Sequence, residues 1–475
     1  MFDRSCSFVA MQQRPYTSAE MESNVIDKNE YAANPQTAEP MQADGKKAPP
    51  AIWTPSELRT VPAFYPLEKS SRLVEDDTAA AVAARLSNCL RQMSIHAVYD
   101  NDTACLWTSE NVEMHLSLWK TPPTSPQQGI VVELQRRSGD SIAFHRYSRT
   151  ILDAALGLLD MDMLEIDDDI IYSKKVQRLL MMELRNSADK EEHETAVQAI
   201  EIAHGLLMKD RMDARVLGLE SLCLLTDPRK TGFITSMLAS HVVLLGSTQG
   251  VEIPGLEPDS YVDEGPFQEI RSGILNLIQF KRIGEDDDFA DENAMVDIDK
   301  EHMTLLHNLA LAVLANALDC VEHPDRTRSD FDGSASSLTG DDNLKPRARM
   351  RTASSTEVAN EFMQQTEELS KKEILSTLIS ELGKAADKPH NAVLSAKCIG
   401  SLCRASDEAK KRAKELGAKQ VVSTALEVGV RTHLRLETEC ERVVTVLERT
   451  TSEEDGTREV ETTTQDSNQT DDEDM

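Results

Sequence analysis

The chain has 475 residues, of which 40% are hydrophobic and only 4% are aromatic, so it is long enough for more than one domain. The low aromatic content favours a core of Ala, Leu and Val between helices over a large β-sandwich. The formal net charge of −31 argues against general binding to DNA or RNA, which depends on Lys and Arg contacts that release counterions.

Cysteine usage and apolar runs bear on the location of the protein. The 8 cysteines are scattered without a CxxC motif, which predicts reduced and buried thiols in an intracellular protein. No apolar run reaches the roughly 18 residues that a transmembrane helix needs. The first residues, MFDRSCSFVAMQQR, have too short an apolar core for a signal peptide. We therefore expect a cytoplasmic protein, with the nucleus and the membrane surface left open as further locations.

Residues 1–75 are predicted to be mostly disordered, because Gln, Asn, Pro, Glu and Ala alternate without periodicity. The apolar exceptions are Ile52, Trp53, Phe64, Tyr65 and Leu67. They form either a short docking motif or a segment that folds back on a neighbouring domain, and we favour the second reading.

Residues 76–160 predict a small α+β domain. Asp77-Thr78 is placed to cap a helix that runs to about Met93. Alternating apolar residues predict strands around 95–99, 112–118 and 130–134. The turn at 138–141 then leads into a closing helix, whose stripe is Phe144, Tyr147, Ile151 and Ala155.

Residues 110–156 resemble the C-terminal half of the kinase-associated domain found at the C-termini of microtubule-affinity-regulating kinases. The shared features are the apolar strand 130–134, the basic pair Arg136-Arg137, Ser138-Gly139 and Phe144 at the start of the last helix. The resemblance implies the fold of that domain and a site for anionic phospholipid. It implies no kinase activity, because the chain has no Gly-rich loop with its Lys, no HRD and no DFG motif.

A local basic cluster surrounds the predicted strand, turn and helix. Its members are Arg136, Arg137, His145, Arg146 and Arg149. The acids between residues 130 and 150 are Glu133 and Asp140, so this segment is net positive. Each Arg near an anionic bilayer could contribute on the order of 1 kcal/mol to binding. The alternative is a solvated face, or pairing with acidic segments of the same chain.

Residues 161–450 are predicted to be helical, with inserts near 246–266, 284–301 and 324–356 and an acidic disordered tail at 451–475. The most informative stretch is 390–428. Pro389 precedes a helix whose apolar stripe is Ala392, Ala396, Ile399 and Cys403, and Gly417-Ala418 separates the next two helices. Each helix is too short to bury its own face, so it needs stacked neighbours.

This stretch resembles an armadillo repeat, with weaker echoes at 193–226, 302–319 and 374–383. The resemblance implies a mainly α fold, an armadillo-like α-solenoid with a groove for a protein partner. Peptide-gripping armadillo proteins carry an Asn on the third helix of each repeat, and here the matching positions are Ser221, Asn316 and Ser401. Two of these depart from the pattern, so an Asn ladder is not expected.

Catalytic and metal-binding motifs are missing from the sequence. It contains no HExxH, GxSxG, P-loop or Rossmann fingerprint, and its acidic runs lack the spacing of a calcium loop. We expect no enzyme activity, no cofactor and no metal site. Ser354 follows Arg349 and Arg351, a pattern that basophilic kinases read, which makes it a candidate phosphorylation site.

The sequence therefore predicts a non-enzymatic scaffold or adaptor that binds an unidentified protein through an α-solenoid groove. The alternative is a peripheral membrane adaptor, in which the small α+β domain binds anionic phospholipid.

Overall fold

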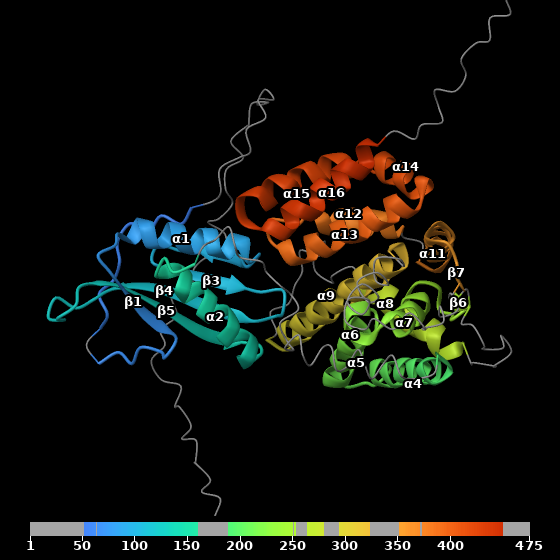
Figure 1. Cartoon of the computed structure of the whole chain (residues 1–475), viewed down its shortest axis with the longest axis horizontal. Helices are drawn as coiled ribbons and strands as arrows, with labels where there is room; N and C mark the ends of the chain where they lie inside the picture. Colours follow the sequence, from blue (N-terminus) through green and yellow to red (C-terminus); the bar gives the residue numbers. More distant parts are fainter. Residues whose placement is uncertain are drawn as a thin grey trace, which may run out of the picture. The chain divides into compact units, whose positions relative to one another are not determined.

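The computed structural model describes residues 52–62, 64–159, 189–249, 251–252, 264–279, 294–323, 351–370 and 373–449. They all belong to one compact unit, Ala48–Met475. Figure 1 shows an antiparallel sheet with two helices, built from the described residues up to 159, and a larger group of helices built from the rest. We call these the sheet domain and the helical domain. The predicted combination of a mainly helical chain with a small N-terminal α+β region is confirmed.

The sheet domain contains a five-stranded antiparallel sheet with strand order β1-β5-β4-β3-β2. Its strands are β1 (Ser71–Glu75), β2 (His96–Tyr99), β3 (Thr103–Trp107), β4 (Glu113–Lys120) and β5 (Gly129–Ser138). Two helices, α1 (Ala79–Gln92) and α2 (Ser141–Ala155), share a buried core with the sheet (Figure 1). The sequence predicted β2, β4, β5 and both helices, whereas β1 and β3 were not assigned.

The core of the sheet domain follows the period-two alternation of its central strands. Leu116 and Leu118 on β4 lie opposite Leu134 and Val132 on β5, and all four are fully buried. The two helices begin at side-chain caps, because Thr78 accepts a hydrogen bond from the amide of Ala81 and Asp140 does the same for Ala143. These local signals explain why both helices were predictable.

The sheet domain begins upstream of residue 76, so the predicted disorder up to residue 75 is corrected for the described residues from 52 on. The Trp53 indole is 3% exposed, and its N–H donates to the carbonyls of Asp100 and Asn101 at 3.1 Å each. The Tyr65 hydroxyl donates to Glu133 at 3.1 Å. Because these aromatic side chains gain burial and hydrogen bonds on the sheet domain, the segment folds although its composition resembles a disordered chain.

The helical domain contains most of the remaining described residues. Its longer helices are α4 (Asp189–Leu207), α5 (Met212–Leu225), α7 (Phe233–Leu245), α8 (Gly265–Gln279), α9 (Ala294–Glu322), α11 (Ser355–Ser370), α13 (Pro389–Ala405), α15 (Ala418–Thr432) and α16 (Leu434–Glu448). Shorter elements are α6 (Pro228–Thr231), α12 (Ile374–Leu382), α14 (Asp407–Glu415) and the strand pair β6 (Val251–Glu252) with β7 (Arg351–Thr352). One continuous apolar cluster of mostly Leu, Ala, Ile and Val joins these helices.

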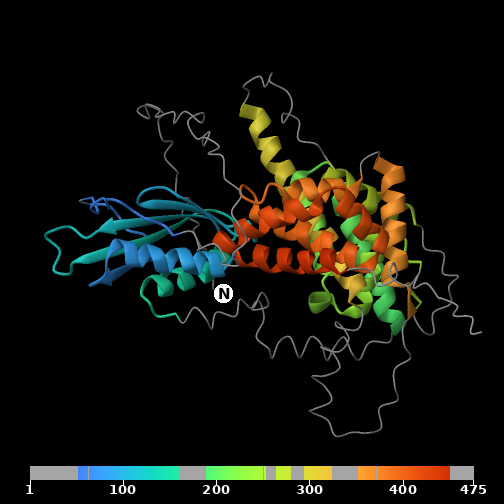
Figure 2. The same cartoon turned by 90° about the horizontal axis from the view of Figure 1, so that it is seen from above.

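The segment 390–428 forms three helices where its spacing predicts them. Pro389 occupies the first turn of α13, and Ala392, Ala396 and Ile399 are fully buried. Gly417 has a φ of +75°, the left-handed conformation that lets α14 end and α15 begin. Figure 2 shows α13, α15 and α16 side by side, and the buried faces of these helices contribute to the common core.

The predicted inserts have different edges in the structure. The predicted insert 246–266 contains β6 and the start of α8 at Gly265. Helix α9 begins at Ala294 within 284–301, and β7 and the start of α11 at Ser355 fall at the end of 324–356. A polar composition predicts where an insert lies but not where it ends, because a helix can start on polar residues. Residues 250, 253–263, 284–293 and 324–350 of these inserts, residues 160–188 and the predicted tail 451–475 lie outside the described residues.

One stretch of the described residues, His302–Glu322 in α9, is long and apolar enough to span a membrane, and 56% of it is buried within the protein. Its inward residues Leu306, Ala310 and Leu314 are fully buried. The packing of α9 among other helices accounts for the apolar character of this stretch.

Candidate functional site

The predicted basic residues of the sheet domain are divided between several places. His145, Arg146 and Arg149 lie on α2 at positions that share one helix face with Ile142. Ile142 is 79% exposed. The structure therefore brings three of the five basic residues together beside an exposed apolar side chain.

Arg146 is held by a neighbour that the sequence did not reveal. Its guanidinium forms an ion pair with Glu110 and lies 5.2 Å from the centre of the Tyr147 ring. The Tyr147 hydroxyl also donates to Glu110 at 3.0 Å. Burial, reinforced by the charge of Glu110, raises the pKa of Tyr147. Arg149 and His145 are the exposed basic side chains left on this face.

Arg136 and Arg137 lie at the end of β5, where a register shift occurs opposite β4. Arg136 donates from Nη1 to the carbonyl of Gly139 at 2.6 Å, so it braces the turn into α2. Arg137 acts electrostatically on Cys105 and His115, which face each other on β3 and β4. Arg136 therefore stabilises the turn before α2, whereas Arg137 acts on residues of β3 and β4.

Ser354 caps the N-terminus of α11. Its hydroxyl accepts from the amide of Glu357 at 3.2 Å, and the Glu357 carboxylate accepts from the amide of Ser354 at 3.1 Å. This reciprocal arrangement is a capping box, and it satisfies two amides that the helix itself leaves without partners. Ser354 is exposed and accessible to a kinase, but its hydroxyl already has a structural role.

An open groove in the described part of the helical domain has a volume of about 970 Å³. It lies where the end of α4, the start of α5 and the start of α9 meet. Its apolar lining consists of Leu206, Met212, Ala214, Val216, Leu217 and Leu305. Its polar rim consists of Lys209, Arg211, Asp213, Glu220 and His302.

Helix α5 is apolar on more than one face. Leu219, Leu222 and Leu225 point into the core, the last being 8% exposed and the other two fully buried. On the outer side Leu217 is 51% exposed and Leu224 is 53% exposed. They lie seven residues apart, so they share a face, and Leu217 also lines the groove. Val216 and Cys223 on the same helix are only partly buried.

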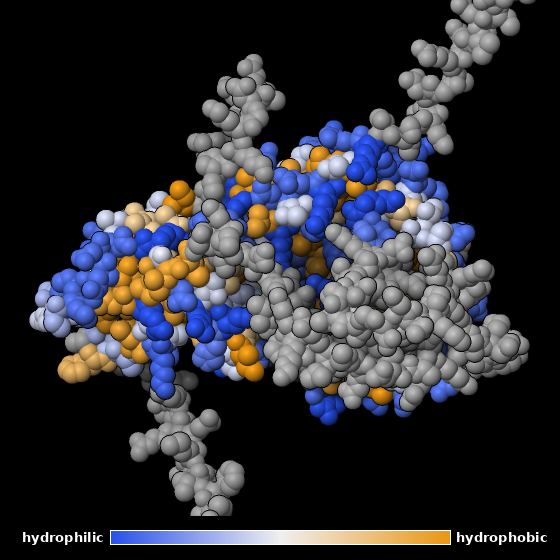
Figure 3. All heavy atoms as spheres, viewed as in Figure 1, coloured by the Kyte–Doolittle hydropathy of each residue, from blue (hydrophilic) through white to orange (hydrophobic). Residues whose placement is uncertain are grey.

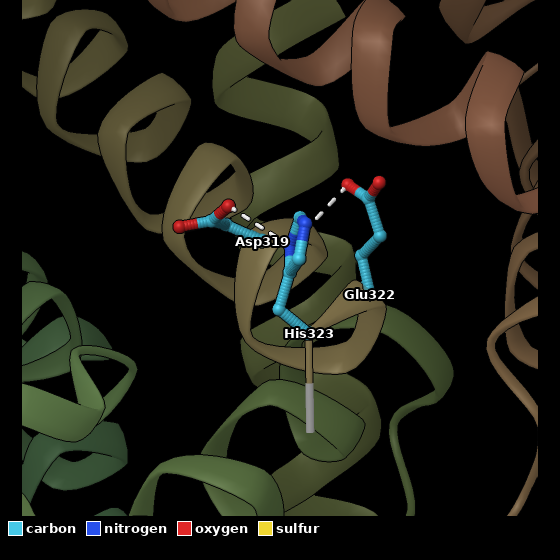
Figure 4. Close-up of side chains that lie close together, drawn as sticks. All are labelled: Asp319, Glu322 and His323. Atoms are coloured by element: carbon cyan, nitrogen blue, oxygen red, sulfur yellow. Dashed lines mark ion pairs between the residues drawn. The ribbon is translucent and has the colours of Figure 1, made fainter. Parts of the chain in front are cut away.

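Asp319, Glu322 and His323 form the one group in the described part of the chain whose side chains are close enough to hold a metal ion (Figure 4). The nearest carboxylate oxygens lie 3.6 Å and 3.8 Å from His323 Nδ1. Arg404 forms a bidentate ion pair with Glu322, and Lys397 lies 3.1 Å from Asp319. These cations compete with a metal ion for both carboxylates, so the cluster is accounted for as an ion-pair network between α9 and α13.

Several buried polar groups lie away from the groove lining. His241 on α7 is fully buried, and burial lowers its pKa to about 4, with the backbone of Gln249 acting in the opposite direction. Arg271 on α8 is 3% exposed, and its Nε and Nη2 have no hydrogen-bond partner among the described residues. A catalytic group must reach substrate, and a fully buried imidazole has no such access. His241 therefore offers no basis for an active site.

Comparison with known proteins does not assign this chain to a class. No family model, no curated protein and no solved structure matches it. The resemblances to armadillo repeats and to a kinase-associated domain therefore stay predictions, and the functional argument depends on the surfaces described above.

Proposed function

We propose that this chain is a non-enzymatic cytoplasmic scaffold of armadillo-like architecture, whose helical domain binds an apolar segment of a protein partner. The observation that carries the proposal is the groove between α4, α5 and α9, together with the exposed leucines of α5. The partner segment would place apolar side chains against Leu217 and Leu224.

The energetic argument starts from α5. Complete burial of a leucine side chain contributes about 1.5–3 kcal/mol relative to full exposure. Leu217 and Leu224 are 51% and 53% exposed, so burial against a partner would gain about half of that free energy at each residue. Met208, which follows the end of α4, is also 44% exposed. Clustered apolar exposure next to a groove is typical of an interaction surface.

The charges around the groove favour a protein segment over lipid or nucleic acid. Lys209 and Arg211 are basic, Asp213 and Glu220 are acidic, and Arg211 already pairs with Asp213 at 2.5 Å. An anionic bilayer or a nucleic acid requires one dominant positive sign. A rim of both signs suits a polypeptide, whose own charges and amides can pair with either sign.

A selection with a displayed random-peptide library on the full-length protein tests this proposal. Peptides are kept that bind the wild type, after counter-selection on the variant Leu217→Glu/Leu224→Glu. We expect a family of peptides with apolar anchors at regular spacing. A library that enriches no common sequence on the wild type, or one that binds the variant equally well, would contradict the proposal.

The face of α2 supports a second candidate function, binding to an anionic membrane. Ile142 is 79% exposed and shares its face with His145 and Arg149, an apolar residue flanked by cations. Such a residue can enter the headgroup region while the cations meet anionic lipid.

Sedimentation of the full-length protein with phosphatidylserine-containing and neutral vesicles tests the second candidate. The variant Ile142→Glu/Arg149→Ala should lose charge-dependent binding, while the control Arg72→Ala, which changes another exposed arginine, should keep it. Equal sedimentation with both vesicle types would contradict membrane binding.

A further inference from the structure

The sheet domain and the C-terminal helices meet at a small, polar and largely buried contact. Arg91, in the last turn of α1, donates from Nε to the carbonyl of Val430 at 2.7 Å and forms an ion pair with Glu437 of α16. The side chains of this pair are 13% and 7% exposed. The amide of Arg435 donates to the hydroxyl of Ser94 at 3.0 Å. The two domains are therefore joined by directed polar bonds.

Two histidines extend this contact as a chain of hydrogen bonds. His390 Nε2 lies 2.9 Å from the carbonyl oxygen of Trp107 on β3. His433 Nε2 lies 3.3 Å from His390 Nδ1, and the rings meet edge to face at 5.1 Å. The amide of Leu436 donates to His433 Nδ1 at 3.3 Å, which caps α16. The chain thus runs from α16 through α13 to the sheet.

The partners at the two ends fix the protons within the chain. A carbonyl oxygen can only accept, so His390 carries its proton on Nε2. A backbone amide can only donate, so His433 Nδ1 is unprotonated and its proton lies on Nε2, facing His390 Nδ1. Both rings are therefore neutral. A second proton on His390 would place its Nδ1–H against the Nε2–H of His433, and a second proton on His433 would place its Nδ1–H against the amide of Leu436. Either change would break one hydrogen bond of the chain.

The surroundings also oppose a positive charge on these rings. His433 is 1% exposed and His390 is partly buried. Burial lowers the pKa of His390 to about 4, with the charges of His96 and Arg435 acting in the same direction and the bond to Trp107 acting against it. Burial, followed by the charges of His390, Arg435 and His96, lowers the pKa of His433 well below its ordinary value of 6.5.

The charged groups around the chain come from every element packed against it. Arg435 lies on α16, and His96 lies on β2 with its ring 5.5 Å from that of Trp107. Asp387, just before α13, raises the pKa of His96, although burial lowers that pKa overall. Arg91 and Glu437 compensate each other in the adjacent ion pair. No carboxylate is bonded to either ring of the chain, so no neighbour in the described contact would offset a new positive charge.

We propose that the His390–His433 chain is an acid-sensitive latch, which holds the sheet domain against α13 and α16 at neutral pH and opens more readily as the pH falls to about 5.5. In the open state the rings meet water and titrate near 6.5, whereas in the closed state His390 titrates at about 4. At pH 5.5 this difference favours opening about tenfold for His390 alone. The proposal is independent of what the groove or the α2 face binds.

Hydrogen exchange of the full-length protein between about pH 7.5 and 5.5, corrected for the intrinsic pH dependence of exchange, tests the latch. The reporting amides are that of Leu436, which bonds to His433 in the cap of α16, and that of Arg435, which bonds to Ser94 across the contact. The matched control is the amide of Ala409, which bonds to Ser406 in a cap of the same kind without a histidine. We expect the corrected rate to rise about tenfold or more at the reporting amides, and not at Ala409.

A non-titrating variant separates the latch from general acid unfolding. In His390→Gln/His433→Asn, the Gln amide can still donate to Trp107 and the Asn side chain can still cap α16. The acid response at Leu436 should disappear in this variant. If the double variant does not fold, His433→Asn alone should lose more than half of the response. An unchanged rate in the wild type, or a full response in the variant, would overturn the proposal.

Discussion

Substitution of Gly218 by Ala tests the close packing of α4 against α5, on which the groove depends. A Cβ atom at Gly218 would lie 2.8 Å from the backbone nitrogen of Leu207, 3.0 Å from the carbonyl oxygen of Ala203 and 3.2 Å from the Cα of Leu207. All three atoms belong to the backbone of α4, so none can rotate away. The added methyl group must therefore push the two helices apart.

The magnitude follows from two opposing effects. Overpacking of a tight contact costs about 1–3 kcal/mol, whereas replacing a helical glycine by alanine returns about 1 kcal/mol of helix propensity. Because the obstructing atoms at Gly218 are backbone atoms, we expect the upper half of the overpacking range. Gly218→Ala should therefore lower the free energy of unfolding by about 1–2 kcal/mol.

Gly205 provides a matched control on α4, because a Cβ atom there would meet nothing within 4 Å. Gly205→Ala should raise the free energy of unfolding by about 0.5–1 kcal/mol through helix propensity alone. Urea denaturation followed by circular dichroism measures both variants. The reasoning is refuted if Gly218→Ala is as stable as Gly205→Ala, because the two helices would then not be in the close contact described here.

Three further predictions concern pH, capping and metal ions. Because burial lowers the pKa of His390 from 6.5 to about 4, its contribution to stability is complete above pH 6.5 and is lost as the pH falls toward 4. Between about pH 7.5 and 5.5 the free energy of unfolding should therefore fall by about 1.4 kcal/mol more in the wild type than in His390→Gln. Ser354→Ala should lower stability by about 1 kcal/mol through loss of the capping box, whereas Ser354→Asn should be nearly neutral in the same denaturation assay. Excess zinc should not change the melting temperature of the wild type, because Arg404 already pairs with Glu322. If zinc raises the melting temperature of Arg404→Met but not that of Arg404→Met/Glu322→Gln, the ion pair alone prevents zinc from binding.

The helices that the sequence predicted are those with local signals. Helices α1 and α2 begin at Thr78 and Asp140, whose caps can be read from neighbouring residues, and α13 begins at Pro389. Strand β1 escaped prediction because its partner is distant, with Ser71 opposite Glu133 on β5. A strand this short is defined by pairing across the sheet, which the local sequence does not specify.

The surfaces were harder to predict than the elements for the same reason. Helix α5 is apolar around most of its circumference, so its sequence alone could not show that Leu217 and Leu224 face outward. The neighbour of Arg146, Glu110, lies 36 residues away in the chain. His390 and His433 are 43 residues apart, and only the packing of α13 against α16 brings their rings together.

The most direct test of the proposed scaffold function is the affinity of a library-selected peptide, measured by fluorescence anisotropy with the full-length protein. Leu217→Glu places a charge in the groove lining, whereas Val98→Glu changes a side chain of similar exposure, 53%, on β2. We expect Leu217→Glu to weaken binding at least about tenfold, which corresponds to about 1.4 kcal/mol, and Val98→Glu to leave it unchanged. Equal affinity of the wild type and Leu217→Glu would contradict the claim that this groove is the binding surface.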